Sequence, residues 1–210
     1  MYRPIWSDVA YGRGVTRAFR QQVDDGIVDR AAALFARHGF EQTSVQAVAD
    51  AVGLSKAGLL HHFPSKDSLH EAVLAAADTL GQEALDQVAG MPLGAARDRR
   101  AVEVLVDIAL AHPGLVSLIL GPVTQLGTDD CGRQVGAPAM AAFGVDPESA
   151  DLERLIRVSG ALAALAVLAL GANQAGQVGA WRAHLIDTSF DALGHRRPGA
   201  ALPVPHQVEA

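Results

Sequence analysis

The chain has 210 residues, half of them apolar, a formal net charge of −6 and one cysteine. Few aromatic residues stand beside many Ala, Leu and Val residues, which favours packed helices over a β-sandwich. The single Cys131 excludes an internal disulfide and indicates a reducing compartment.

Residues 1–19 mix Pro, Gly and Arg without periodicity, so we expect a flexible N-terminal arm. Arg13, Arg17 and Arg20 could reach a phosphate or the minor groove, or they could belong to a solvated tail. Apolar residues at helical spacing then predict a first helix over about 20–38. No basic and apolar leader is visible at the N-terminus, and we expect a cytoplasmic protein.

Two short helices joined by a tight turn are predicted next. Thr43 to Gln46 has the capping-box pattern, a hydroxyl at the N-cap and a glutamine three positions later. Gly53 can adopt the left-handed conformation that ends a helix, and Ser55 is the next N-cap. A third helix therefore begins at Ser55 and runs to about Phe63.

The rest of the chain alternates helical periodicity with Gly and Pro breaks, and no run of strands is visible. Asp146, Pro147 and Glu148 form a helix start signal, with a cap, a proline and an acid in the first turn. The Pro-rich segment 196–210 is expected to be disordered. Further helices are expected over about 65–88, 96–111, 114–121, 130–143, 147–172 and 178–193.

No charged residue occurs between Arg157 and Arg182. The densely apolar part, 158–172, is shorter than the roughly 20 residues that a membrane span needs. A helix that is apolar all round is instead buried on several sides. It could be the central helix of a monomer, but we favour a homodimer through the helices at 147–172 and 178–193.

The only two lysines, Lys56 and Lys66, lie in or just after the predicted third helix. Residues 1–70 carry eight basic and seven acidic side chains, against nine and sixteen in residues 71–210, so the basic balance lies in the N-terminal part. We expect the start of the third helix to enter the major groove of DNA. The expected DNA-binding residues are Thr43, Ser44, Ser55, Lys56, Ala57, Gly58, Leu60, His61, His62 and Lys66.

The run SKAGLLHHFPSKDSL, from Ser55 to Leu69, resembles the tetracycline-repressor (TetR) family of bacterial transcription regulators. The resemblance covers about residues 20–75. It implies an all-α homodimer with an N-terminal three-helix helix-turn-helix domain and a C-terminal helical domain for ligand binding and dimerisation. Such a dimer reads a palindromic operator and is released by a small molecule.

The resemblance implies roles for single residues. Thr43 and Ser44 match the backbone-contacting start of the second helix, His62 matches the usual histidine, and Lys66 matches the phosphate-binding lysine. Leu60 stands where the family usually has a tyrosine that touches the DNA backbone, and could touch a thymine methyl instead. We expect about nine helices, with the arm at 1–19, the DNA-binding domain at 20–66 and the ligand-binding and dimerisation domain at 67–195.

No cofactor or metal is expected, because adjacent His61 and His62 lack the spacing of metal-binding helices. Cys131 could be a redox sensor, but Asp129 and Asp130 beside it disfavour a thiolate. The effector is expected to be largely apolar, with Arg157 or Gln125 orienting it. The candidate ligand-binding residues, each of which could equally be ordinary core, are Leu105, Ile108, Leu118, Met140, Phe143, Arg157, Leu162 and Trp181.

A ligand-responsive repressor is thus the leading hypothesis. A DNA-binding regulator without a small-molecule effector is the first alternative. An enzyme on a helical scaffold is the second, but the sequence shows no nucleophile elbow, metal spacing or glycine-rich phosphate loop.

Overall fold

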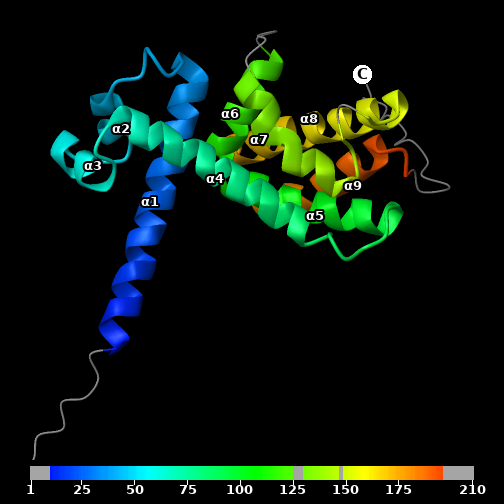
Figure 1. Ribbon diagram of the computed structural model, residues 1–210, viewed down its shortest axis with the longest axis horizontal. Helices are drawn as coiled ribbons and strands as arrows, with labels where there is room; N and C mark the ends of the chain where they lie inside the picture. The colour runs from blue at the N-terminus through cyan, green and yellow to red at the C-terminus, as the bar shows by residue number, and fades with distance from the viewer. Residues whose placement is uncertain (1–9, 125–129, 147–148, 196–210) are drawn as a thin grey trace, which may run out of the picture. The chain divides into compact units, whose positions relative to one another are not determined.

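The computed structural model describes residues 10–124, 130–146 and 149–195, and within these ranges every regular element is an α-helix (Figure 1). The expected all-α class is therefore confirmed. The helices are α1 (Ala10–His38), α2 (Val45–Ala51), α3 (Lys56–His62), α4 (Lys66–Asp86), α5 (Ala95–Ala111), α6 (Pro113–Thr124), α7 (Asp130–Ala142), α8 (Leu152–Gln174) and α9 (Val178–Ala192).

Two helix starts differ from the sequence prediction. Helix α1 begins at Ala10 rather than near residue 20, so residues 10–19 are helical although an arm was expected there. Helix α8 begins after Asp151, whose carboxylate accepts a hydrogen bond from the Arg154 N–H, and not after Asp146. Both aspartates fit the local capping pattern, and Asp146 instead holds a turn through the Ser149 hydroxyl.

The chain folds into two compact units. The first contains α1, α2, α3, the start of α4 and α6, and the second contains the end of α4, α5, most of α7, α8 and α9. The chain passes between them after Leu80, Ala111 and Val135. The functional boundaries at residues 19, 66 and 195 do not follow these units and stay a prediction.

The first unit packs around apolar side chains from five helices. Ala31 and Ala32 of α1, Val48 of α2, Leu59 of α3 and Val73 of α4 are almost completely buried together. Leu115 of α6 belongs to the same core. Burying each large side chain of this kind contributes about 1.5–3 kcal/mol, so this core fixes the helix-turn-helix.

Helices α1 and α6 approach each other very closely. The Asp29 carboxylate of α1 accepts a hydrogen bond of 3.0 Å from the Leu115 N–H, in the first turn of α6. A Cβ on Gly114 would collide with the main-chain carbonyl of Asp29. The glycine therefore permits the approach, and the carboxylate pairs with one of the N–H groups that a helix start leaves unpaired.

The second unit contains a buried ionic cluster. The Asp98 carboxylate of α5 is 1% exposed and lies 2.7 Å from both Arg154 Nη2 and His195 Nε2. Beside it, the buried Arg97 guanidinium donates to the carbonyls of Met91, Ala141 and Ala142. These bonds tie the starts of α5 and α8 to the ends of α7 and α9.

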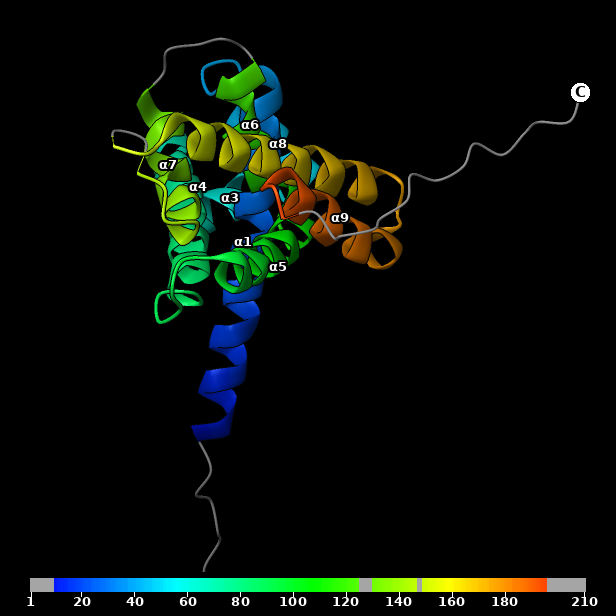
Figure 2. The same ribbon diagram turned by 90° about the vertical axis from the view of Figure 1, so that its right-hand side faces the viewer.

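Helices α8 and α9 lie side by side in the second unit (Figure 2). Helix α8 is long and apolar enough to cross a membrane by length and composition, with a mean hydropathy of 2.0, and 28% of that stretch is buried. A core helix of a soluble protein passes the same test. Much of its apolar surface is exposed, including Leu152, Ile156 and Val167.

Candidate nucleic-acid interface

The turn between α2 and α3 has the geometry that the sequence predicts. The Ser55 hydroxyl accepts a hydrogen bond of 3.0 Å from the Gly58 N–H and so caps α3. Gly53, at φ 72°, takes the left-handed conformation between the two helices. Phe63 is the C-cap of α3: its backbone is extended, and its N–H donates to the Leu59 carbonyl.

The cap of α2 is Ser44 rather than Thr43. The Ser44 hydroxyl accepts from the Ala47 N–H at 3.0 Å, whereas Gln46 bonds Asp50 on the same helix. The predicted capping box is thus wrong by one residue. Thr43 is 2% exposed, and its hydroxyl donates to the Gly39 carbonyl at 2.8 Å. Its side chain serves the turn and does not face solvent, whereas Ser44 is exposed.

The first turn of α3 presents small and basic groups to solvent. Ser55, Lys56 and Ala57 are exposed, and Lys56 makes no hydrogen bond or ion pair with any residue that the structure describes. Gly58 is half-buried, and a Cβ there would lie 3.2 Å from the Ser55 Oγ. Glycine at this position therefore leaves room for the Ser55 hydroxyl that caps the helix. Leu60 is half-buried.

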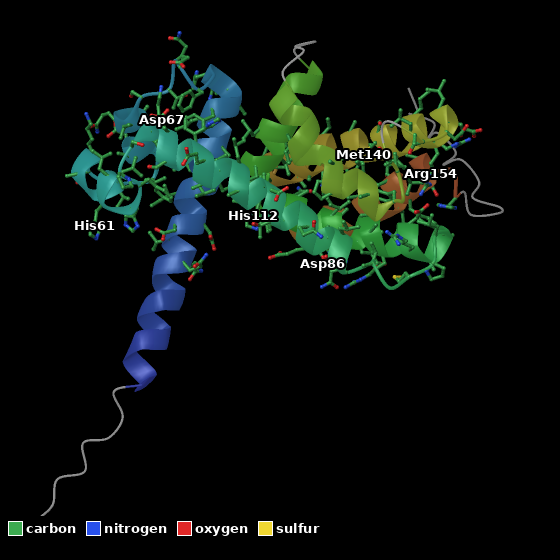
Figure 3. All side chains as sticks on the ribbon, viewed as in Figure 1. His61, Asp67, Asp86, His112, Met140 and Arg154 are labelled. Carbon is green, nitrogen blue, oxygen red and sulfur yellow. The ribbon has the colours of Figure 1, made fainter. Side chains whose placement is uncertain are left out.

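The two histidines at the end of α3 have different surroundings. His61 is exposed, on the outer side of the helix (Figure 3). His62 Nδ1 lies 2.6 Å from Asp24 Oδ1 of α1, and its side chain is 18% exposed. No local sequence pattern points to Asp24 as the partner of His62, because the two residues are 38 positions apart.

Lys66 is held by the loop between α1 and α2. Its ammonium donates to the Phe40 carbonyl at 3.0 Å and to the Glu41 carbonyl at 3.4 Å. It also lies 4.2 Å from the centre of the Phe40 ring, a cation–π distance. Two of its three N–H donors are thereby engaged, which leaves one for a phosphate.

The candidate ligand-binding residues do not gather in one unit. Leu118 of α6 packs against the core of the first unit, whereas the other seven belong to the second. Leu105 and Phe143 are buried, Ile108, Met140, Leu162 and Trp181 are half-buried, and Arg157 is exposed and paired with Glu153. Gln125 lies outside the described residues. Among the described residues, no three His, Cys, Asp or Glu side chains gather as metal ligands would.

An open depression of about 400 Å³ lies in the first unit, between α1 and the turn from α2 to α3. None of the candidate ligand-binding residues lines it. The lining residues are Gln22, Val23, Gly26, Ile27, Arg30, Ala51, Val52 and Leu54.

Residues 27–73 match the family model described as bacterial regulatory proteins, tetR family. The chain is 44% identical over 48 residues to the HTH-type transcriptional repressor KstR2 of Rhodococcus jostii strain RHA1, covering 23% of this chain and 24% of that protein. It is 40% identical over 47 residues to the icaADBC biofilm operon negative regulator IcaR of Staphylococcus aureus strain Newman, covering 22% of this chain and 25% of that protein.

The chain thus matches only about a quarter of the length of these curated relatives. Among solved structures, it is similar to AibR in complex with isovaleryl coenzyme A and operator DNA, at a TM-score of 0.40 and 19% identity. That similarity covers 86% of this chain and 90% of the other.

Proposed function

Because the chain belongs to the tetR family of bacterial regulatory proteins, we propose that it is a cytoplasmic transcriptional repressor. It binds a palindromic operator as a homodimer and leaves the DNA when a small, largely apolar effector binds. The observation that carries this proposal is the exposed first turn of α3, with Ser55, Lys56 and Ala57. Regulators of this family are not enzymes, which removes the enzyme alternative.

The chemistry of α3 suits the major groove. Ala57 has a small side chain, and Gly58 has none, so a groove wall can come close to the backbone there. Lys56, which pairs with none of the described residues, can donate to a guanine edge or to a phosphate. Ser44 at the start of α2 places a hydroxyl beside the free N–H groups of a helix end, which favours phosphate contact.

The exposed side of α8 supports the homodimer. Leu152 and Ile156 lie one turn apart and are 67% and 62% exposed, and Val167 farther along is 59% exposed. Large apolar side chains that lie exposed along one helix favour an interaction site there. Small residues such as Gly160 and Ala163 allow the same helix of a second copy to approach, and α9 lies next to it.

The effector is proposed from the family. Its site belongs to the C-terminal helices, and the expected residues Leu105, Ile108, Met140, Phe143 and Leu162 would give it an apolar lining. A regulator without an effector stays the alternative. Thermal unfolding with a panel of apolar carboxylates, acyl thioesters and neutral lipids separates the two, because a ligand raises the midpoint as its concentration exceeds the Kd.

Selection of bound sequences from a random duplex library tests DNA binding. We expect an inverted repeat whose half-sites lie about one helical turn, 34–36 Å, apart. Lys56→Ala should weaken binding by about tenfold, in line with 1–3 kcal/mol for a base contact, and relax the preference at one position of each half-site. If the purified chain stays monomeric and binds no duplex even at low salt, the proposal is wrong.

A further inference from the structure

The recognition helix α3 is held in place by few contacts. It has seven residues, and Leu59 is its one buried side chain. Its N-terminal end is fixed by the Ser55 cap and the turn from α2. Its C-terminal end is fixed to α1 by the contact between His62 Nδ1 and Asp24 Oδ1, at 2.6 Å.

The contact between His62 and Asp24 is strong enough to hold the C-terminal end of α3 on α1. The His62 side chain is 18% exposed and that of Asp24 36%, so water and salt screen the pair less than an open surface pair. Either a neutral imidazole with its proton on Nδ1 or a protonated imidazole can donate to the carboxylate. The bond therefore forms in both protonation states, and a hydrogen bond to a charged acceptor is shorter and stronger than a neutral one.

We propose that Asp24 and His62 are positioning residues for DNA recognition. Asp24 anchors the end of α3 on α1 and thereby sets the direction in which the opposite end, with Lys56 and Ala57, enters the groove. His62, which the sequence analysis placed among the DNA-binding residues, is then engaged with a carboxylate and acts on DNA only through the placement of α3. This inference rests on the proposed DNA-binding function.

A positioning role and a purely electrostatic role of Asp24 predict opposite changes in DNA affinity when Asp24 is removed. Asp24 is an anion on the DNA-binding unit, and phosphates repel it. If it only carried charge, its removal would raise DNA affinity. If it positions α3, its removal lowers affinity in spite of the lost repulsion. The direction of the change therefore separates the two roles.

Asp25 is a matched control. It is the next residue of α1, carries the same charge, is exposed and has no hydrogen bond or ion pair with the described part of the chain. Asp24→Ala and Asp25→Ala change the net charge equally, but only the first breaks the contact with His62. Asp24→Asn removes the charge and keeps an acceptor oxygen, so it serves as the conservative variant.

The experiment measures the binding of full-length variants to a duplex selected by the wild type, by fluorescence anisotropy at several salt concentrations. We expect Asp24→Ala to bind about tenfold more weakly, which corresponds to about 1.4 kcal/mol. Asp25→Ala should bind as well as the wild type or better, and Asp24→Asn should recover most of the loss. His62→Ala should match Asp24→Ala, and the double variant should be no worse than either.

Several results would overturn the inference. Asp24→Ala could bind as tightly as Asp25→Ala. Alternatively, His62→Ala could flatten the salt dependence by about one unit while Asp24→Ala leaves it unchanged, which would mean that His62 contacts a phosphate. Circular dichroism checks that each variant is folded. If Asp24→Ala is unfolded, the DNA affinities of His62→Ala and Asp24→Asn test the positioning role instead. Failure of the wild type to bind any duplex would reject the proposed function itself.

Discussion

The first unit packs its helices mainly through apolar side chains, whereas the second adds a buried ionic cluster where its helices begin and end. In the first, α3 is held by Leu59, a cap and the contact with Asp24, and its first turn exposes Lys56 and Ala57. In the second, Asp98 is almost fully buried and pairs with Arg154 and His195. The proposed function fits this difference, because contact with DNA needs side chains that are available to it, and pairing of two subunits needs a rigid helix.

The sharpest test of this difference is Asp98→Asn. It leaves Arg154 without its counter-charge beside the Phe143 carbonyl. We expect a loss of about 3 kcal/mol in the free energy of unfolding, the usual result of breaking a buried pair. Denaturant unfolding measures it. A loss below about 1 kcal/mol, typical of surface pairs, would remove the contrast between the units.

The tight junction of α1 and α6 gives the next effect. Gly114→Ala forces α6 away from the Asp29 carbonyl, and overpacking of this kind costs about 2 kcal/mol. Gly26→Ala is the control, since it lies within α1 and a Cβ there meets nothing. That change should stabilise the protein by about 0.5–1 kcal/mol through helix propensity. Equal effects of the two substitutions would contradict the close approach.

Lys66→Ala tests whether the first unit depends on single polar contacts. It removes the bonds to the Phe40 and Glu41 carbonyls and the contact with the Phe40 ring. We expect a loss of about 1 kcal/mol in unfolding free energy. If the lysine also contacts a phosphate, the salt slope of DNA binding should fall by about one unit. Unchanged stability with a changed slope would make it a DNA contact alone.

The smallest effect is expected at Asp107, on the surface of the second unit. The Arg182 guanidinium, which donates to this carboxylate, holds the pKa of Asp107 below its ordinary value. The pair therefore stabilises the fold above about pH 4, and this contribution is lost as pH falls through the lowered pKa. Because both groups are about half exposed, Asp107→Asn should cost at most a few tenths of a kcal/mol at neutral pH and remove that part of the acid dependence.

Local signals in the sequence predicted much of the fold. The Ser55 cap and Gly53 gave the ends of α2 and α3, because capping depends on a few neighbouring residues. Capping could not choose between Asp146 and Asp151 for α8, since both satisfy the same rule. Residues 10–19 of α1 show neither a capping pattern nor a regular apolar spacing from which a helix could be predicted.

The candidate site was less predictable where it depends on distant residues. Lys56 and Ala57 could be placed on the exposed face from helical periodicity alone. The partner of His62 could not be predicted, because Asp24 lies 38 positions away in the sequence and meets it only in the folded structure. Asp98 lies in a charged stretch between Arg97 and Arg99 that resembles a solvated face, and burial overrides that pattern.

The place of α6 bears on how chimeric regulators should be built from this protein. A hybrid that joins residues 10–80 to a foreign effector domain would lose Leu115 from its core and leave the Asp29 carboxylate without its N–H donor. The foreign partner would have to supply an equivalent helix with a glycine at its first turn. Transferring α6 together with residues 10–80 keeps the core beneath the helix-turn-helix intact.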